Sequence, residues 1–122
     1  MSDPTGDPLA VVREHVAAFN ERDLDAVMAT FADDAVLASG EQVVVGHRAL
    51  RTLFADSFSA PVSARLELNR SVVSGTTAAC ELTETLEAAG ASHTLEVAAF
   101  YTVHRGRLTR VKIYRDLAEP SE

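Results

Sequence analysis

Hydrophobic residues in the first half of the chain recur every three or four positions, which is the period of a helix with one face on a core. This spacing predicts three helices, over residues 8–20, 24–33 and 47–60. Asp7 caps the first helix, Pro8 occupies its first position, and Pro61 stops the third. Two short strands are predicted between the second and third helices, over residues 35–39 and 42–45.

From Pro61 to the end of the chain, hydrophobic residues instead alternate with polar ones, which is the period of a strand with one covered face. Long antiparallel strands are therefore predicted after the helices. The side chains expected on the covered face are Ala64, Leu66, Leu68, Ala78, Cys80, Leu82, Glu84, Leu86, Leu95, Val97, Ala99, Tyr101, Val103, Thr109, Val111, Ile113 and Arg115. Helices followed by a meander of strands predict an α+β fold.

The turn at residues 104–106 decides how the last two strands align. A two-residue loop would set Tyr101 opposite Arg110 and mix the two faces of the sheet. A three-residue loop with Gly106 in the left-handed conformation sets Tyr101 opposite Thr109 and keeps the apolar face together. The sequence therefore favours the three-residue loop.

The same alignment predicts a contact between two charged residues. The preceding hairpin is expected to pair Glu84 with Leu95, and the last hairpin to pair Leu95 with Arg115. The backbones of Glu84 and Arg115 would lie about 9.6 Å apart, which is two strand spacings. Two long side chains can meet over Leu95 at that separation.

Length and charge narrow the classes of function. The 122 residues suffice for one domain, with a core predicted over about residues 8–117 and short polar tails. The net charge of −7 and the lack of a Lys/Arg run argue against a nucleic acid or an anionic membrane as the partner. The acidic, polar N-terminus and the lack of an 18-residue apolar run predict a cytoplasmic protein without a membrane span.

Cysteine and histidine usage argues against a metal centre. Cys80 is the single cysteine, so an internal disulfide is excluded, and its place in mid-strand predicts a buried, inert thiol. The four histidines show no H-x-H or H-E-x-x-H spacing. There is also no P-loop, nucleophile elbow or dinucleotide glycine pattern, so we expect neither a metal nor another cofactor.

Glu84 is the first candidate for chemistry, because it stands between Leu82 and Leu86 on the covered face, where an isolated carboxylate is costly. It is either a general acid or base in a wet pocket or one half of a fixed ion pair with Arg115. His15 lies at the edge of the apolar stripe of the first helix. It can donate to a ligand carbonyl or take a proton there, or it makes one hydrogen bond at the boundary of helix and sheet.

Three further polar residues are candidates for ligand contact. Arg115 can clamp a ligand carboxylate or enolate, or it lies past the covered part of the sheet. Tyr101 can point its hydroxyl at a ligand, or it fills volume. Ser39 can hydrogen-bond a substrate, or it caps a turn. The adjacent acids Asp33 and Asp34 are expected to form a solvated edge.

Short motifs, in a fixed order, carry a family resemblance. They are F-A-D-D-A at residues 31–35, G-H-R-A-L at residues 46–50, G-R-L at residues 106–108 and I-Y-R-D at residues 113–116. The chain resembles the nuclear transport factor 2-like superfamily, in particular its SnoaL-like and ketosteroid-isomerase-like bacterial members. The resemblance implies a cone of three helices on a strongly curved, mainly antiparallel sheet, open at one end to an apolar pocket. It also implies a homodimer through the outer face of the sheet, which here carries Ala98, Phe100, Thr102 and Tyr114.

The resemblance also indicates where the family's functional groups fall in this chain. The general-base aspartate of the ketosteroid isomerases falls on Ser39, their oxyanion-hole tyrosine near His15, and their protonated aspartate near Ala99. The acid that SnoaL-like cyclases and limonene-epoxide-hydrolase-like enzymes carry on the final strand falls near Ile113. Three familiar acids are therefore absent, which argues against isomerisation, aldol cyclisation and epoxide opening by the known routes.

The sequence predicts a protein that binds an apolar, carbonyl- or hydroxyl-bearing small molecule and either catalyses a proton transfer of isomerase, cyclase or dehydratase type or holds the molecule for another protein. The alternative is a module without chemistry that holds a ligand or forms a dimer. The predicted catalytic residues are Glu84 and His15. The predicted ligand-binding residues are Tyr101, Arg115, Ser39, Phe19, Phe54, Leu82, Val97, Ala99, Val111 and Ile113.

Overall fold

The computed structural model describes residues 7–115, which form three helices and six strands. The helices are α1 (Pro8–Asn20), α2 (Leu24–Ala29) and α3 (His47–Ser59). The strands are β1 (Phe31–Ser39), β2 (Gln42–Val45), β3 (Ser63–Ser74), β4 (Thr77–Ala88), β5 (Ala91–His104) and β6 (Arg107–Arg115). The predicted tails, the last two residues of the predicted core and the end of the I-Y-R-D motif lie outside the described residues.

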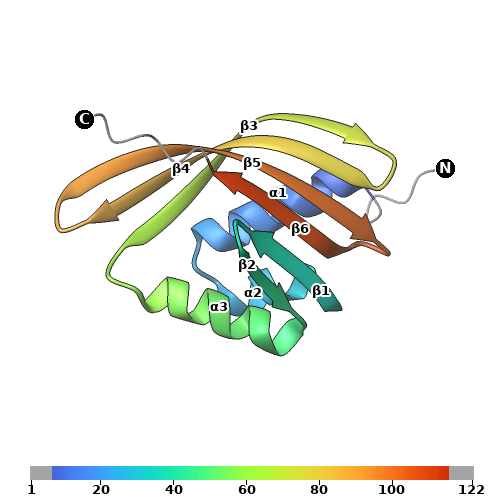
Figure 1. Ribbon diagram of the computed structural model, residues 1–122, viewed down its shortest axis with the longest axis horizontal. Helices are drawn as coiled ribbons and strands as arrows, with labels where there is room; N and C mark the ends of the chain where they lie inside the picture. The colour runs from blue at the N-terminus through green and yellow to red at the C-terminus, as the bar shows by residue number, and fades with distance from the viewer. Residues whose placement is uncertain (1–6, 116–122) are drawn as a thin grey trace.

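The six strands form one sheet in the order β2-β1-β6-β5-β4-β3. Neighbouring strands are antiparallel except β1 and β6, which run parallel. The long strands arch over α1, which packs against β3, β4 and β5, while α3 packs against the short pair β1 and β2 (Figure 1). This arrangement confirms the predicted α+β fold with three helices on a mainly antiparallel sheet.

The core lies between the helices and the covered face of the sheet. Asp7 caps α1 as predicted, since its Oδ1 accepts a hydrogen bond of 3.1 Å from the backbone nitrogen of Leu9. The largest fully buried side chains come from all layers of the fold: Phe31, Met28, Leu50, Leu82, Leu108, Val12, Val27 and Val111. Burial also alternates along β4 and β5, so the alternation in the sequence identified the covered face of these two strands correctly.

The predicted second helix is too long by about four residues. It ends at Ala29, Thr30 forms its C-cap, and β1 begins at Phe31 rather than at residue 35. The spacing of the apolar residues up to Phe31 fits a helix, whereas the structure places Phe31 on a strand. The parallel ladder with β6 overrides that spacing: Phe31 pairs with Leu108, whose backbone nitrogen donates to the carbonyl oxygen of Thr30 at 2.7 Å.

The predicted alignment of β5 with β6 is wrong by two residues. Tyr101 lies opposite Val111, not Thr109, and the loop is a two-residue turn of Arg105 and Gly106, both with positive φ. The two faces do not mix, because the ladder skips Thr109 as a bulge: Thr102 pairs with Arg110, whereas its neighbour Val103 pairs with Leu108.

The pairing of β4 with β5 is confirmed, with Glu84 opposite Leu95. In β3 the ladder skips Asn69 in the same way, since Leu68 pairs with Leu82 but Arg70 pairs with Glu81. Such bulges bend a strand and increase its twist. The two skipped residues, Asn69 and Thr109, lie on strands at opposite sides of β4 and β5, and both contribute to the curvature of the sheet over the helices.

Candidate functional site

A cavity of about 180 Å³ lies between α1, α3 and the covered face of the sheet. For comparison, a cavity of roughly 150 Å³ in an apolar core accommodates benzene. All twelve residues predicted for the site line this cavity: His15, Phe19, Ser39, Phe54, Leu82, Glu84, Val97, Ala99, Tyr101, Val111, Ile113 and Arg115. Their roles in binding or catalysis stay predictions.

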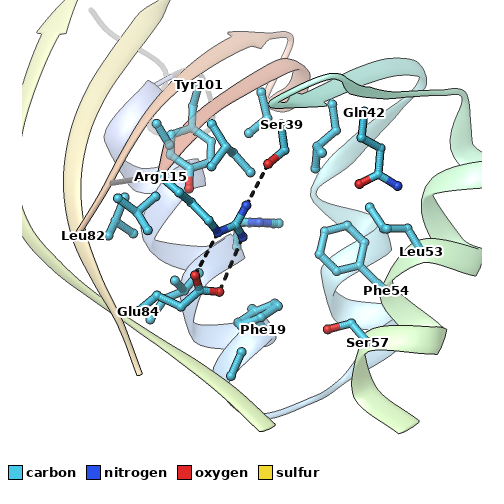
Figure 2. A pocket seen from close by; sticks show the side chains of 18 residues that line it. Phe19, Ser39, Gln42, Leu53, Phe54, Ser57, Leu82, Glu84, Tyr101 and Arg115 are labelled. Atoms are coloured by element: carbon cyan, nitrogen blue, oxygen red, sulfur yellow. Dashed lines mark hydrogen bonds and ion pairs between the residues drawn. The ribbon is translucent and has the colours of Figure 1, made fainter. Parts of the chain in front are cut away.

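Six further residues line the cavity: Leu37, Gln42, Leu53, Ser57, Ala64 and Leu66. Two of them, Ala64 and Leu66, already belonged to the predicted covered face and could have been included from the sequence. Gln42 and Ser57 are polar and follow no apolar period, so the sequence carried no signal for them. They contribute polar atoms on the β2 and α3 side of the cavity (Figure 2).

The Arg115 guanidinium stands inside the cavity between Glu84 and Ser39 (Figure 2). Its Nε lies 3.0 Å from Glu84 Oε1, its Nη2 lies 3.5 Å from Oε2, and its Nη1 donates to Ser39 Oγ at 2.7 Å. The Glu84 side chain is 8% exposed and that of Arg115 is 35% exposed. The predicted contact exists, but Arg115 lies opposite Val97 and reaches Glu84 diagonally across β5.

This rim cluster, defined as Glu84, Arg115 and Ser39, balances its own charge. Both carboxylate oxygens of Glu84 face the guanidinium, which provides the partner that a buried carboxylate needs. The geometry corresponds to the ion-pair alternative for Glu84. The pair therefore adds no net charge to the cavity.

His15 lies deeper in the site, on α1, and is only 5% exposed. Its Nδ1 is 3.0 Å from Thr30 Oγ1, and its ring lies edge-on to those of Phe31 and Phe54, with centroids 5.2 and 6.0 Å away. Burial among these groups lowers the pKa of His15 from its ordinary 6.5 to about 4. The imidazole is therefore neutral at physiological pH.

Tyr101 faces His15 from β5, with the two ring centroids 6.1 Å apart. Burial raises the pKa of the Tyr101 phenol, so the phenol is neutral at physiological pH. Burial also raises the pKa of the Cys80 thiol to about 11, consistent with the predicted inert thiol. The Tyr101 hydroxyl points into the pocket (Figure 2).

Two polar atoms are left for a ligand. Within residues 7–115, neither His15 Nε2 nor the Tyr101 hydroxyl has a hydrogen-bond partner, yet this part of the chain contains no sealed, unpartnered side-chain nitrogen or oxygen. Both atoms therefore open onto the cavity. His15, Thr30 and Tyr101 together form what we call the deep cluster.

Among residues 7–115 no group of three or more His, Cys, Asp or Glu side chains is placed to hold a metal ion. In this described part of the chain, no helix has the length and apolar character needed to cross a membrane. Asp33 and Asp34 are exposed on β1, on a strand rather than at the predicted helix end.

Three helices on a curved sheet, with a cavity on the covered face, define the nuclear transport factor 2-like class of domain. A family model described as the SnoaL-like domain matches residues 12–111. The chain belongs to the SnoaL-like domain family.

Solved structures with the same fold include proteins named for different activities. An LEH-like epoxide hydrolase from M. tuberculosis is 25% identical with a TM-score of 0.80, covering 88% of this chain and 80% of its own. A candidate polyketide cyclase from Sinorhizobium meliloti is 27% identical with a TM-score of 0.73, covering 84% and 92%. A candidate ketosteroid isomerase from Kribbella flavida, at 19% identity and a TM-score of 0.76 over 93% and 80%, shares the fold alone.

Proposed function

We propose that the cavity binds a small, neutral, largely apolar molecule with a carbonyl or hydroxyl group, and that the protein transfers a proton on this molecule. The observation that carries the proposal is the deep cluster, in which neutral His15 and neutral Tyr101 open onto an apolar cavity. The neighbours named as an epoxide hydrolase and a polyketide cyclase support enzymatic chemistry of this general kind. They do not name a substrate for this chain.

His15 is the group that we propose for the proton transfer. Its neutral imidazole can take a proton from an O–H, or from a carbon next to a carbonyl, without first leaving a partner. Glu84, the first candidate from the sequence, already faces the Arg115 guanidinium with both carboxylate oxygens. Its role as proton carrier stays a prediction, and we propose that it mainly holds Arg115 in place.

Tyr101 and Arg115 would stabilise the charge that this step creates. Removing a proton from the ligand leaves negative charge on its oxygen, where a neutral phenol can donate a hydrogen bond. The Arg115 guanidinium has five N–H groups and uses three of them on Glu84 and Ser39, so it can donate a further hydrogen bond at the same cavity. The low pKa of His15 applies to the empty cavity, and an adjacent ligand anion would raise it during the reaction.

Exchange of carbon-bound hydrogen for deuterium tests both parts of the proposal. Cyclopentanone and cyclohexanone are suitable probes, because each is about the size of the cavity. In D₂O, the wild-type protein should shift amide signals of cavity residues on binding and accelerate exchange next to the carbonyl at least tenfold over His15→Gln. The control His104→Gln, which changes an exposed histidine at the end of β5, should behave as wild type.

The outcomes separate the alternatives. Binding of the ketones without His15-dependent exchange would contradict proton transfer and favour a protein that only holds its ligand. If neither ketone shifts the amide signals of the cavity residues, binding of this ligand class is contradicted.

We also propose that two copies pair through the outer face of the sheet. Phe100 and Tyr114 are 45% and 52% exposed there, with ring centroids 6.1 Å apart, and Val72 extends the apolar surface across Ala79. Sedimentation should give about 26 kDa, twice 13.1 kDa. Phe100→Lys should give a monomer, whereas Val43→Lys, at an exposed valine on β2, should not; a 13 kDa wild-type species at micromolar concentration would contradict the dimer.

A further inference from the structure

Thr30, at the C-terminal end of α2, connects His15 to the backbone of that helix. Its buried Oγ1 lies 3.0 Å from His15 Nδ1 and 2.6 Å from the carbonyl oxygen of Val27. The backbone of Thr30 is itself fixed, since its nitrogen donates to Val27 and its carbonyl oxygen accepts from the nitrogen of Leu108. The hydroxyl is therefore held in place from both sides.

The protons available on these groups determine the tautomer of His15. The Thr30 hydroxyl has one proton, and the Val27 carbonyl has none to give, so the 2.6 Å contact uses the proton of Thr30. Only lone pairs of Oγ1 remain for His15, and Nδ1 must therefore carry a hydrogen. A neutral imidazole has a single N–H, which leaves a lone pair on Nε2, the atom that opens onto the cavity.

We propose that Thr30 is a positioning residue that fixes His15 as a hydrogen-bond acceptor at Nε2, so that the cavity selects ligands presenting an O–H or N–H donor to His15. This selection rests on the proposed function, because it requires that a ligand occupies the cavity. The positioning role of Thr30 does not rest on the proposed function, because the tautomer of the His15 imidazole can be measured in the protein without a ligand.

The selection follows from the cost of an unmatched polar atom. A carbonyl or ether oxygen against Nε2 would place two lone pairs face to face in a buried site, and neither group would gain a hydrogen bond. The Tyr101 hydroxyl rotates and can donate to a carbonyl elsewhere on the same molecule. The ligand class that satisfies both residues carries a hydroxyl and a carbonyl on a frame of about one ring.

Nitrogen NMR of histidine-labelled protein without a ligand tests the assignment of Thr30. His15→Gln identifies the His15 signals by their loss. Wild type and the conservative Thr30→Ser should show hydrogen on Nδ1, whereas Thr30→Val, which keeps the shape but lacks the hydroxyl, should show a larger share of hydrogen on Nε2. Hydrogen on Nε2 in wild type would overturn the proposal, as would an unchanged spectrum of His15 in folded Thr30→Val.

Binding of phenol and anisole tests the selection, because the two differ by a methyl group that removes the donor. We expect wild type and Thr30→Ser to bind phenol about tenfold more tightly than anisole, and Thr30→Val to lose most of this preference. Equal binding of both probes by wild type would overturn the selection. Binding of neither probe would overturn the selection together with ligand binding itself, while the NMR result would still establish or refute the role of Thr30.

Discussion

The cavity contains two polar clusters that use their hydrogen bonds differently. In the rim cluster, Glu84, Arg115 and Ser39 satisfy one another through three contacts of 2.7–3.5 Å. In the deep cluster, His15 contacts Thr30 through Nδ1, while its Nε2 has no hydrogen-bond partner among residues 7–115 and opens onto the cavity. The same apolar side chains line the cavity next to both clusters.

The difference separates two features that can mark a site: a buried charged residue and a polar atom without a partner. Glu84 was the first candidate from the sequence, because an isolated carboxylate on an apolar face is costly. That cost is met by Arg115, so the carboxylate needs no ligand to account for it. His15 is less conspicuous in the sequence, yet one of its nitrogens has no partner among residues 7–115.

The largest expected effect comes from breaking the rim cluster at Arg115. Arg115→Met would leave Glu84 buried without its partner and should cost about 3 kcal/mol of unfolding free energy, measured by urea denaturation. Adding Glu84→Gln should recover part of that loss, because no charge then remains buried.

An exposed ion pair provides the control for this variant. Arg51 and Asp25 lie 2.6 Å apart, but both are well exposed, so Arg51→Met should cost no more than about 0.5 kcal/mol. Equal losses in Arg115→Met and Arg51→Met would show that the rim cluster contributes no more than a surface pair.

The deep cluster should make stability depend on pH. The pKa of His15 is about 4 in the folded protein and 6.5 in the unfolded chain, so between these values only the unfolded chain binds the proton. The contribution of neutral His15 to the free energy of unfolding is fully present above pH 6.5 and is lost as the pH falls towards 4. At 1.36 kcal/mol per pH unit, the loss amounts to about 3 kcal/mol.

Urea denaturation of wild type and His15→Asn from pH 7 to pH 4 isolates this contribution, since both proteins share every other titrating group. The stability advantage of wild type should shrink steadily over that range. A difference that stays constant with pH would show that the folded protein accepts the proton on His15 as readily as the unfolded chain does.

The smallest effect on stability is expected at Thr30, although its effect on His15 is specific. Thr30→Val leaves the Nδ1 hydrogen without an acceptor and should cost about 1 kcal/mol, whereas Thr30→Ser should restore most of it. Thermal or urea unfolding of the two variants measures the difference. A larger loss in Thr30→Ser than in Thr30→Val would indicate that the methyl group, not the hydroxyl, matters at this position.

Much of the site could be predicted because it depends on alternation along strands. The period-two pattern placed Leu82, Glu84 and Tyr101 on one face, and the register of β4 with β5 needed only that pattern and the turn between them. The contact of Glu84 with Arg115 followed even though the assumed alignment of β6 was wrong. A shift of two residues preserves the face, and an arginine is long enough to reach diagonally.

The features that the sequence did not reveal depend on contacts between distant segments. Thr30 meets His15 across fifteen positions and belongs to no apolar period, so nothing marked it as part of the site. Phe31 fits the spacing of a helix, but its ladder with Leu108 places it on a strand. The bulge at Thr109 allows a two-residue turn without mixing the faces, and the local sequence does not distinguish this from a three-residue loop.

The bulges at Asn69 and Thr109 make the curvature of a strand independent of which of its side chains face the cavity. Each bulge adds a residue that the ladder passes over, so the residues on either side keep the face they would have without it. Shortening the chain at Thr109 would therefore leave the same side chains lining the cavity while flattening the strand that carries them. The curvature of the strand can therefore change, in evolution or by design, without replacement of any residue that lines the cavity.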